Sequence, residues 1–269
     1  MAEPLRFELI GKPLGHSLSP QLHELIAVRA GFACRYALRE LEPAQVRGYV
    51  RSLPSSGLSG VNVTIPHKLE AYASVDALAP TAWAVGAVNT IAIEDGRTVG
   101  HNTDYDGFGA MLAAAGIDAA GRQATVLGSG GSARAAAAWL TGHGCDVTVI
   151  SRGGGTLPGA RSAGYDAVPG GHLLVNATPV GMYPHGDACP LPEREIARYE
   201  AVADLIYNPL ETVLLRRAAA LGLRCADGLV MLVAQAVRAQ EIWQGRFFGA
   251  SLLRTVHTRL LQALREAQA

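Results

Sequence analysis

The chain has 269 residues, 49% of them hydrophobic, which is enough for one large domain or two ordinary ones. Its formal net charge is zero, which argues against nucleic acid or an anionic membrane surface as the main partner. Four scattered cysteines without metal-site spacing, and no apolar run of signal-peptide or membrane-span length, predict a cytoplasmic protein with reduced thiols and no metal.

Strand-like and helix-like segments alternate along the first hundred residues. The predicted strands are 6–11, 35–41 and 60–65, and the predicted helices are 19–31 and 43–53. The first helix has Ser19 at its expected N-cap and Gly31 at its end. Within residues 90–102, Asp95-Gly96 is the signature of a two-residue hairpin turn. The alternation predicts an α/β protein with largely parallel sheets.

A second alternation follows, and it carries a glycine motif. Its predicted elements are a helix near 107–116, strands at 124–128 and 146–150, and a helix over 128–140. The spacing Gly128-x-Gly130-x-x-Ala133 between strand and helix fits the dinucleotide-binding fingerprint. The first glycine permits a tight turn, the second lets backbone approach a pyrophosphate, and the small third residue allows close packing. We therefore expect a nucleotide-binding Rossmann-like domain rather than a plain glycine-rich turn.

The end of the second strand of this domain is where the adenosine ribose of a dinucleotide is expected. An NAD site usually places Asp or Glu there, whereas this chain has Ser151-Arg152, and Asp146 lies at the opposite end of the strand. A guanidinium forms charge-assisted hydrogen bonds with a 2′-phosphate, which an acid would repel. NADP is therefore the expected cofactor. NAD stays possible if Arg152 is only a solvated loop residue.

Six further motifs occur in order along the chain. They are GKPLGHSLSPQLH, NVTIPHK, GAVNT, HNTDYDGF, NATPVGM and DGLVMLVAQA. Together with the glycine loop they resemble the shikimate dehydrogenase family over nearly the whole chain. The resemblance implies a two-domain enzyme with a cleft between its domains, which reversibly reduces 3-dehydroshikimate to shikimate with NADPH. The expected partner is this small-molecule substrate, with no nucleic acid and no membrane, in a monomer or a homodimer.

The resemblance also implies roles for individual residues. Lys68 and Asp104 would form the catalytic pair. The substrate-binding residues would be Ser17 and Ser19 for the carboxylate and Thr64, Asn89 and Gln235 for the ring hydroxyls, with Tyr207 nearby. The cofactor-binding residues would be Gly128, Ser129, Gly130, Gly131, Ser132, Ala133, Ser151, Arg152, Asn176, Thr178, Leu205 and Gly228. The chain has Thr156 where the family commonly has a further arginine, so Arg152 is the only arginine expected at the adenosine loop.

Lys68 is notable because the chain has only one other lysine, Lys12, and its remaining positively charged residues of this kind are all arginine. Reduction of a ketone builds negative charge on oxygen, which must be stabilised and then protonated. A lysine ammonium can do both, whereas arginine does not give up its proton. We therefore expect Lys68 to act on the proton of the reacting hydroxyl, with Asp104 orienting Lys68 and bonding the same hydroxyl. The sequence leaves open which of the two residues holds the transferred proton at each step.

Taken singly, several of these residues have structural explanations. Ser17 and Ser19 could cap a helix, Asn102 and Asp104 could form an Asx turn, and Gln235 could be a core amide. The histidines near the motifs are interpreted as structural and left out of the chemistry: His16, His67 and His101. The order of all the motifs together favours the enzyme site.

The expected domains are a substrate-binding domain over 1–103, an NADP-binding Rossmann-like domain over 104–226, and C-terminal helices over 227–269 that return to the substrate domain. A quinate or aminoshikimate dehydrogenase of the same family stays an alternative, because these substrates differ from shikimate in few contacts. A catalytically silent nucleotide-binding regulator is a second alternative. The presence of both Lys68 and Asp104 argues against it, since a pure sensor needs neither.

Overall fold

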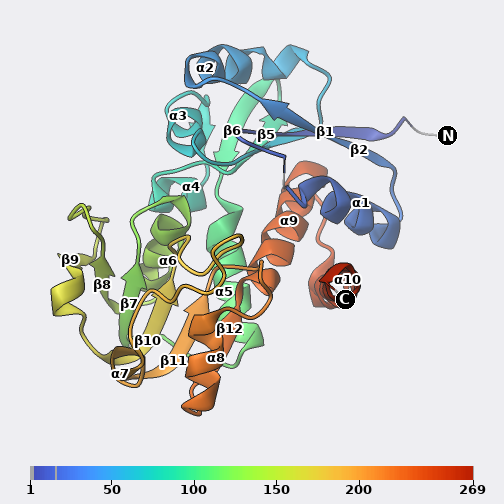
Figure 1. Cartoon of the computed structure of the whole chain (residues 1–269). Coiled ribbons are helices and arrows are strands. Elements are labelled where there is room, and N and C mark those ends of the chain that lie inside the picture. Colours follow the sequence, from blue (N-terminus) through green and yellow to red (C-terminus); the bar gives the residue numbers. More distant parts are fainter. Residues whose placement is uncertain (1–2, 16, 269) are drawn as a thin grey trace. The chain divides into compact units, whose positions relative to one another are not determined.

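The computed structural model describes residues 3–15 and 17–268 and contains two compact units (Figure 1). One unit takes the chain up to Thr103 and again from Val233 onward, and the other comprises Asp104–Leu232. Each has its own six-stranded sheet. The predicted α/β class with two domains is therefore confirmed. The chain returns to the first unit within helix α9 (Gly228–Gln244), later than the expected return at residue 227.

The first unit has a mixed sheet in the order β2-β1-β3-β5-β6-β4. Its strands are β1 (Leu5–Gly11), β2 (Cys34–Glu40), β3 (Gly60–Val63), β4 (Ala77–Leu78), β5 (Thr90–Glu94) and β6 (Arg97–His101). Its helices are α1 (Ser19–Ala30), α2 (Pro43–Ser52), α3 (Lys68–Tyr72), α4 (Pro80–Val85), most of α9 and α10 (Gly249–Gln268). The predicted hairpin joins β5 to β6, with both turn residues at positive φ: Asp95 at 49° and Gly96 at 72°. β5 runs antiparallel to both of its neighbours, whereas the other five strands of this sheet run in one direction, so the sheet is largely parallel, as predicted.

The start of α1 differs from the predicted cap. Ser19 is the first residue of the helix, and Leu18 occupies the N-cap position without a side-chain hydrogen bond. The prediction of Ser19 as N-cap is therefore wrong. The Ser17 hydroxyl instead accepts a hydrogen bond from the Ser19 backbone N–H at 3.2 Å. The predicted stop is correct, because Gly31 closes the helix in the left-handed conformation, with φ at 77°.

The second unit has an entirely parallel sheet in the order β12-β11-β10-β7-β8-β9. Its strands are β7 (Gln123–Leu127), β8 (Asp146–Ile150), β9 (Arg161–Ala163), β10 (Gly171–Asn176), β11 (Tyr199–Asp204) and β12 (Arg224–Asp227). Its helices are α5 (Thr103–Ala114), α6 (Gly131–Gly142), α7 (Glu193–Ile196) and α8 (Val213–Ala220). The strand order reverses between β7 and β10, as in a doubly wound Rossmann sheet. Such sheets bind ligands at the carboxyl ends of their strands beside this reversal.

Two buried clusters cover the two faces of this parallel sheet. One joins α5 and α6 to side chains such as Val126 and Val175, and the other joins α7 and α8 to side chains such as Leu127 and Leu174. Alternate residues of one strand thus face opposite cores, which explains why β7 reads as a continuous apolar run. Among the described residues, no helix is both long enough and apolar enough to cross a membrane.

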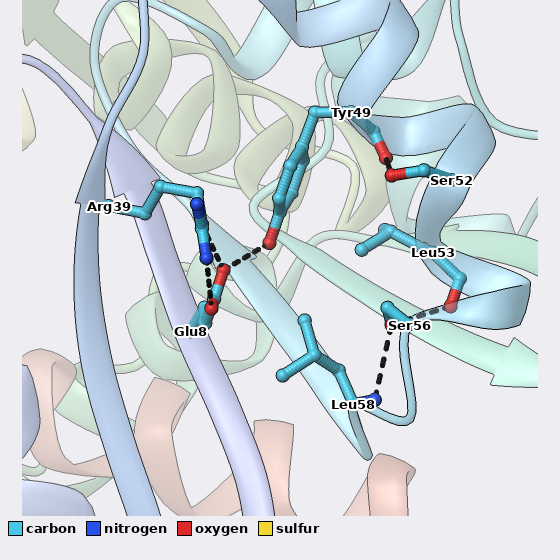
Figure 2. Close-up of polar contacts among 7 residues, drawn as sticks. All are labelled: Glu8, Arg39, Tyr49, Ser52, Leu53, Ser56 and Leu58. Atoms are coloured by element: carbon cyan, nitrogen blue, oxygen red, sulfur yellow. Dashed lines mark hydrogen bonds and ion pairs between the residues drawn. The ribbon is translucent and has the colours of Figure 1, made fainter.

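An ion pair joins β1 to β2 in the first unit. Figure 2 shows the Arg39 fork facing the Glu8 carboxylate, with the Tyr49 hydroxyl from α2 on the other side. The Arg39 Nε and Nη2 atoms donate to Glu8 at 2.6 and 2.8 Å, and Tyr49 donates at 2.5 Å. Glu8 is only 7% exposed, and the Arg39 guanidinium holds the pKa of its carboxyl below the ordinary 4.5. The pair thus ties two strands and a helix together.

We expect Glu8→Gln to lower the free energy of unfolding by about 1.5–3 kcal/mol at neutral pH, the range for hydrogen bonds to charged groups. Because the folded pKa of Glu8 is depressed, its contribution is present above pH 4.5 and is lost as the pH falls further. Urea unfolding gives the free energy of unfolding of the wild type and of Glu8→Gln. The difference between the two should be smaller well below pH 4.5 than at neutral pH. The control is Glu94→Gln, on an exposed residue of β5. A difference in free energy of unfolding between wild type and Glu8→Gln that stays constant with pH would contradict this interpretation.

Candidate functional site

The glycine loop lies at the carboxyl end of β7, next to the reversal of strand order. Gly128 has φ at 107°, and a Cβ added there would lie 2.9 Å from the Ala177 carbonyl oxygen. Its N–H donates to the carbonyl of Ile150, the last residue of β8, at 2.8 Å. Both the left-handed backbone and the close approach require glycine, so the first position of the fingerprint has the predicted role.

The rest of the fingerprint leads into α6. Gly130 is the N-cap of α6, it is exposed, and a Cβ added there would meet no atom within 4 Å. Ser129 is exposed, and Gly131 and Ser132 begin the helix. Ala133 is fully buried in the core beneath the helix. The open space at Gly130 leaves room for an anion at the helix N-terminus, and the small residue at 133 allows α6 to pack closely on the sheet.

The segment after β8 lies beside this loop. The Ser151 hydroxyl accepts a hydrogen bond from the Gly155 N–H at 3.0 Å, and a Cβ at Gly155 would lie 3.2 Å from the Ser129 Cβ. Arg152 is exposed. Asp146, at the far end of β8, pairs with Arg161 at 2.5 Å, as expected for an acid that takes no part in ribose binding. The segment after β8, where the sequence predicts the adenosine ribose, therefore carries an exposed guanidinium and no acid.

The neighbouring strands β10 and β11 end at the same edge. Asn176 is fully buried at the end of β10, and its Oδ1 accepts hydrogen bonds from the N–H and hydroxyl of Thr178 at 3.1 and 2.7 Å. A Cβ on Gly228 would lie 2.3 Å from the Leu205 carbonyl oxygen, so the start of α9 needs glycine there. Tyr207 follows β11, and burial raises the pKa of its hydroxyl. The structure thus gathers the predicted cofactor residues of this unit along one edge of its sheet.

The predicted substrate residues of the first unit also share a sheet edge. Thr64 follows β3, and Asn89 precedes β5, which runs antiparallel to β3. The Thr64 N–H donates to the Ile10 carbonyl near the end of β1, at 2.8 Å. Asn89 is 4% exposed, and its Oδ1 accepts the Thr103 N–H at 2.7 Å. Ser17 lies between β1 and α1, and Ser19 is the first residue of α1, so both follow β1 where it ends at this edge.

The two predicted catalytic residues each begin a helix. Lys68 is the first residue of α3, it is partly buried, and its carbonyl accepts the Val88 N–H at 3.0 Å. Asp104 lies in the first turn of α5 and is 8% exposed. Gln235 lies on α9 and is only partly buried, which differs from a sealed core amide. The sealed amide of that helix is Gln240, which bonds the Nδ1 of His23 at 2.9 Å.

Sequence reasoning missed a buried polar cluster in the first unit. The Tyr36 hydroxyl donates to Asn62 Oδ1 at 2.8 Å, and Asn62 Nδ2 donates to the Thr90 hydroxyl at 3.0 Å. His23 stacks on Tyr36 with ring centroids 4.3 Å apart, and burial lowers its pKa to about 3. His23 is therefore neutral at neutral pH. A signal was present in Asn62, a polar residue inside an apolar strand, because buried amides need partners.

The histidines and the Asx-turn alternative have mixed outcomes. His67 is buried, and its Nε2 bonds the Leu41 carbonyl at 2.9 Å, so the structural interpretation is correct. His101 is partly buried, and burial lowers its pKa, whereas His16 lies outside the described residues. The Asn102 side chain donates to the Ala87 carbonyl at 2.9 Å, while its Oδ1 has no hydrogen-bond partner, so an Asx turn at Asn102 is wrong. In the described part of the chain, no three His, Cys, Asp or Glu side chains gather as metal ligands.

A pocket of about 590 Å³ lies at the opposite, amino-terminal edge of the parallel sheet. Its lining includes the side chains of Arg122, His172, Arg198 and Glu200. The Arg122 guanidinium donates to Glu200 and to His172 at 3.2 and 2.8 Å. The predicted residues Gly128 and Asn176 lie at the far ends of the same strands, so this pocket is not the candidate site.

Comparison with known proteins gives a consistent result. The model for the shikimate dehydrogenase substrate-binding domain matches residues 9–91. A protein of Clostridium perfringens named shikimate dehydrogenase (NADP(+)) is 39% identical over 89% of this chain and 92% of the relative.

Solved structures agree over both units. Shikimate 5-dehydrogenase from Thermus thermophilus, in complex with NADP(H) and shikimate, has a TM-score of 0.84 and 36% identity, covering 95% of this chain and 99% of that one. A chorismate mutase/shikimate 5-dehydrogenase fusion protein from Clostridium acetobutylicum has a TM-score of 0.94 and 32% identity, covering 98% and 100%.

Proposed function

The chain belongs to the shikimate dehydrogenase family, and on that basis we propose that it reversibly reduces 3-dehydroshikimate to shikimate with NADPH. It is an NADP-dependent oxidoreductase that acts on a CH–OH group. The observation that carries the proposal is its similarity, along nearly the whole chain, to enzymes of that name. The relative that holds NADP(H) and shikimate together supports the same pair of ligands here.

The carboxyl edge of the parallel sheet fits the phosphates of a dinucleotide. The space beside Gly130 is open, and the N–H groups and positive dipole end of α6 favour an anion there. We assign the pyrophosphate to the segment 128–133 and the 2′-phosphate to Arg152. Asn176, Thr178, Leu205 and Gly228 then line the route to the nicotinamide. When bound, NADPH supplies the hydride.

The sheet edge of the first unit supplies donors suited to a polyhydroxylated carboxylate. We assign the substrate carboxylate to the hydroxyls of Ser17 and Ser19. The Asn89 Oδ1 already accepts the Thr103 N–H, and one Nδ2–H already donates to the Thr103 hydroxyl at 3.1 Å, so Asn89 can offer its second Nδ2–H to a ring hydroxyl. The further substrate contacts in this proposal are Thr64, Gln235 and Tyr207.

Lys68 and Asp104 form the catalytic pair in this proposal. Oxidation of the shikimate hydroxyl requires its proton to leave as the hydride leaves carbon, and reduction requires the proton to return. Lys68 stabilises the charge on that oxygen and exchanges the proton with it. Asp104, nearly buried at the start of α5, accepts a hydrogen bond from the hydroxyl.

We expect Arg152→Ala to weaken NADP binding by about 1.5–3 kcal/mol, the range for hydrogen bonds to charged groups, and to leave NAD binding nearly unchanged. The reason is that only NADP carries the 2′-phosphate. Isothermal titration with each cofactor checks this. Arg161→Ala is the matched control, because Arg161 pairs with Asp146 on β8. Equal losses for NADP and NAD would contradict the assignment.

We expect Ser17→Ala and Ser19→Ala to raise the KM for shikimate about tenfold or more with a smaller effect on kcat. A carboxylate remote from the reacting carbon is bound alike in the ground state and the transition state. Steady-state kinetics measures both constants, with Ser55→Ala on the exposed 3₁₀ turn as the control. Variants that melt early with an unaltered KM would show that these serines serve the fold.

Two alternatives within this proposal are separated by a substrate panel. Quinate and aminoshikimate share the ring and differ from shikimate at few positions, so a quinate or aminoshikimate dehydrogenase would use the same residues. We expect kcat/KM to be highest for shikimate when all three are offered with NADP. A silent nucleotide-binding regulator would bind NADP and turn over none of them.

A further inference from the structure

A network of hydrogen-bonded side chains lies at the carboxyl ends of β10 and β11, and the buried carboxylate of Asp204 is at its centre. Asp204 is 0% exposed. Its Oδ1 accepts the Asn176 Nδ2–H at 3.0 Å and the Ile206 backbone N–H at 3.2 Å. Its Oδ2 accepts the Thr212 hydroxyl at 2.7 Å. Three donors thus converge on an acid that neither the motifs nor the family resemblance assign to the site.

The same network of hydrogen bonds fixes the turn that follows β10. The Thr178 hydroxyl donates to Asn176 Oδ1 at 2.7 Å and accepts the Val180 N–H at 3.2 Å. Between these residues, the Ala177 N–H donates to the carbonyl of Leu127 at 2.9 Å, and the Ala177 carbonyl oxygen faces Gly128. The position of this turn therefore decides how much room the first glycine of the cofactor loop has.

Asp204 helps to fix the orientation of the Asn176 amide, whose Nδ2 also donates to the Val180 carbonyl at 3.3 Å. An ionised carboxylate only accepts hydrogen bonds, so the NH₂ end of the amide must face Asp204. The oxygen end then faces the N–H and hydroxyl of Thr178, which need an acceptor. A reversed amide would place oxygen against oxygen on one side and NH₂ against N–H on the other. Burial raises the pKa of Asp204 to about 6, so the carboxylate is the main form at neutral pH.

We propose that Asp204 is a positioning residue for the cofactor, which acts by holding the Asn176 amide and, through it, the turn 176–180 beside the glycine loop. The inference rests on the proposed function, because it assigns the turn to NADP. Asp204 itself touches neither substrate nor cofactor in this account. Thr212 is the internal comparison, since it binds the other oxygen of Asp204 and caps α8 through the Leu215 N–H at 3.3 Å.

The test compares Asp204→Ala, Asp204→Asn and Thr212→Val by direct NADP titration, shikimate kinetics and thermal melting. Asp204→Ala should raise the NADP Kd and KM on the order of 10–100-fold, as loss of an outer supporting residue does, and leave the shikimate KM unchanged. Asp204→Asn keeps an acceptor for Asn176 and should retain most NADP affinity. Thr212→Val loses the cap, so it should lower Tm and leave the NADP Kd unchanged.

If the alanine variant does not fold, Asp204→Ser replaces it, because the serine hydroxyl is one bond too short to reach Asn176. A folded alanine or serine variant with wild-type NADP affinity would overturn the inference. So would Thr212→Val weakening NADP as much as Asp204→Ala does. A wild-type protein that binds no NADP would instead refute the proposed function, so the two failures are distinguishable.

Discussion

Lys68→Arg should lower kcat for shikimate oxidation by about 10²–10⁴, nearly as much as Lys68→Met, while NADP affinity is retained. Arginine preserves the positive charge, and the chain uses it almost everywhere else, so a purely electrostatic role would tolerate the exchange. A role in proton exchange does not tolerate it, because guanidinium stays protonated at any accessible pH. The measurement is kcat for each variant, with NADP titration alongside.

The chain provides a matched control in its other lysine. Lys12 is half exposed and pairs with Glu42 at the surface of the first unit, and arginine can make the same pair, so Lys12→Arg should leave kcat unchanged. A Lys68→Arg enzyme that keeps more than about a tenth of its rate would make Lys68 an electrostatic anchor, since that loss lies below the general acid–base range.

Asp104→Asn should also lower kcat steeply. If Asp104 and Lys68 act as one unit, the double variant should lose much less than the product of the two single losses. Additive losses in the logarithm of kcat would instead assign the two residues to separate steps.

Gly130→Ala should reduce kcat/KM for NADP on the order of 100-fold, the size of loss that a misplacement of about 1 Å can cause. Its stability without cofactor should fall by no more than about 1 kcal/mol, the cost of alanine at the N-cap of α6, because a Cβ at Gly130 meets no atom from elsewhere in the fold within 4 Å. In our proposal the methyl group obstructs the pyrophosphate, which approaches the backbone at this position.

Gly128→Ala is the informative comparison in the same loop. There the added Cβ meets the Ala177 carbonyl oxygen at 2.9 Å, and φ lies at 107°, so the apo protein itself should lose about 1–3 kcal/mol of stability. Thermal melting without cofactor and NADP kinetics separate the two variants. A Gly130→Ala protein with normal NADP kinetics would mean that the cofactor does not approach the loop at this point.

Much of the fold follows from local patterns in the sequence. The Asp95-Gly96 turn and the Gly31 stop depend on backbone conformations that few residues adopt, so the residue type alone identifies them. The predicted N-cap of α1 is wrong, although Ser19 is a good capping residue. The helix begins at Ser19, so the backbone of Leu18 occupies the cap position. The antiparallel course of β5 depends on pairing with β3 and β6, a long-range feature that periodicity does not encode.

In the candidate site, too, features encoded in one short segment can be predicted from the sequence, and features that depend on long-range pairing cannot. The glycine positions and the absence of an acid after β8 are properties of one short segment, so they are legible in the sequence. Asp204 was missed because its partner Asn176 is distant in the sequence and its partner Thr212 belongs to no recognised motif. Only the parallel pairing of β10 with β11 places Asp204 opposite Asn176. Its position after an apolar strand run was the available signal, since carboxyl ends of parallel strands carry the ligand contacts.

The most direct test of the central claim is the absorbance of reduced nicotinamide when the purified protein receives shikimate with NADP or NAD. We predict steady formation of NADPH from shikimate, a modest preference for NADP over NAD, and slower turnover of quinate. Tight binding of NADP without turnover of shikimate, quinate or aminoshikimate would contradict the assignment of Lys68 and Asp104 as a catalytic pair.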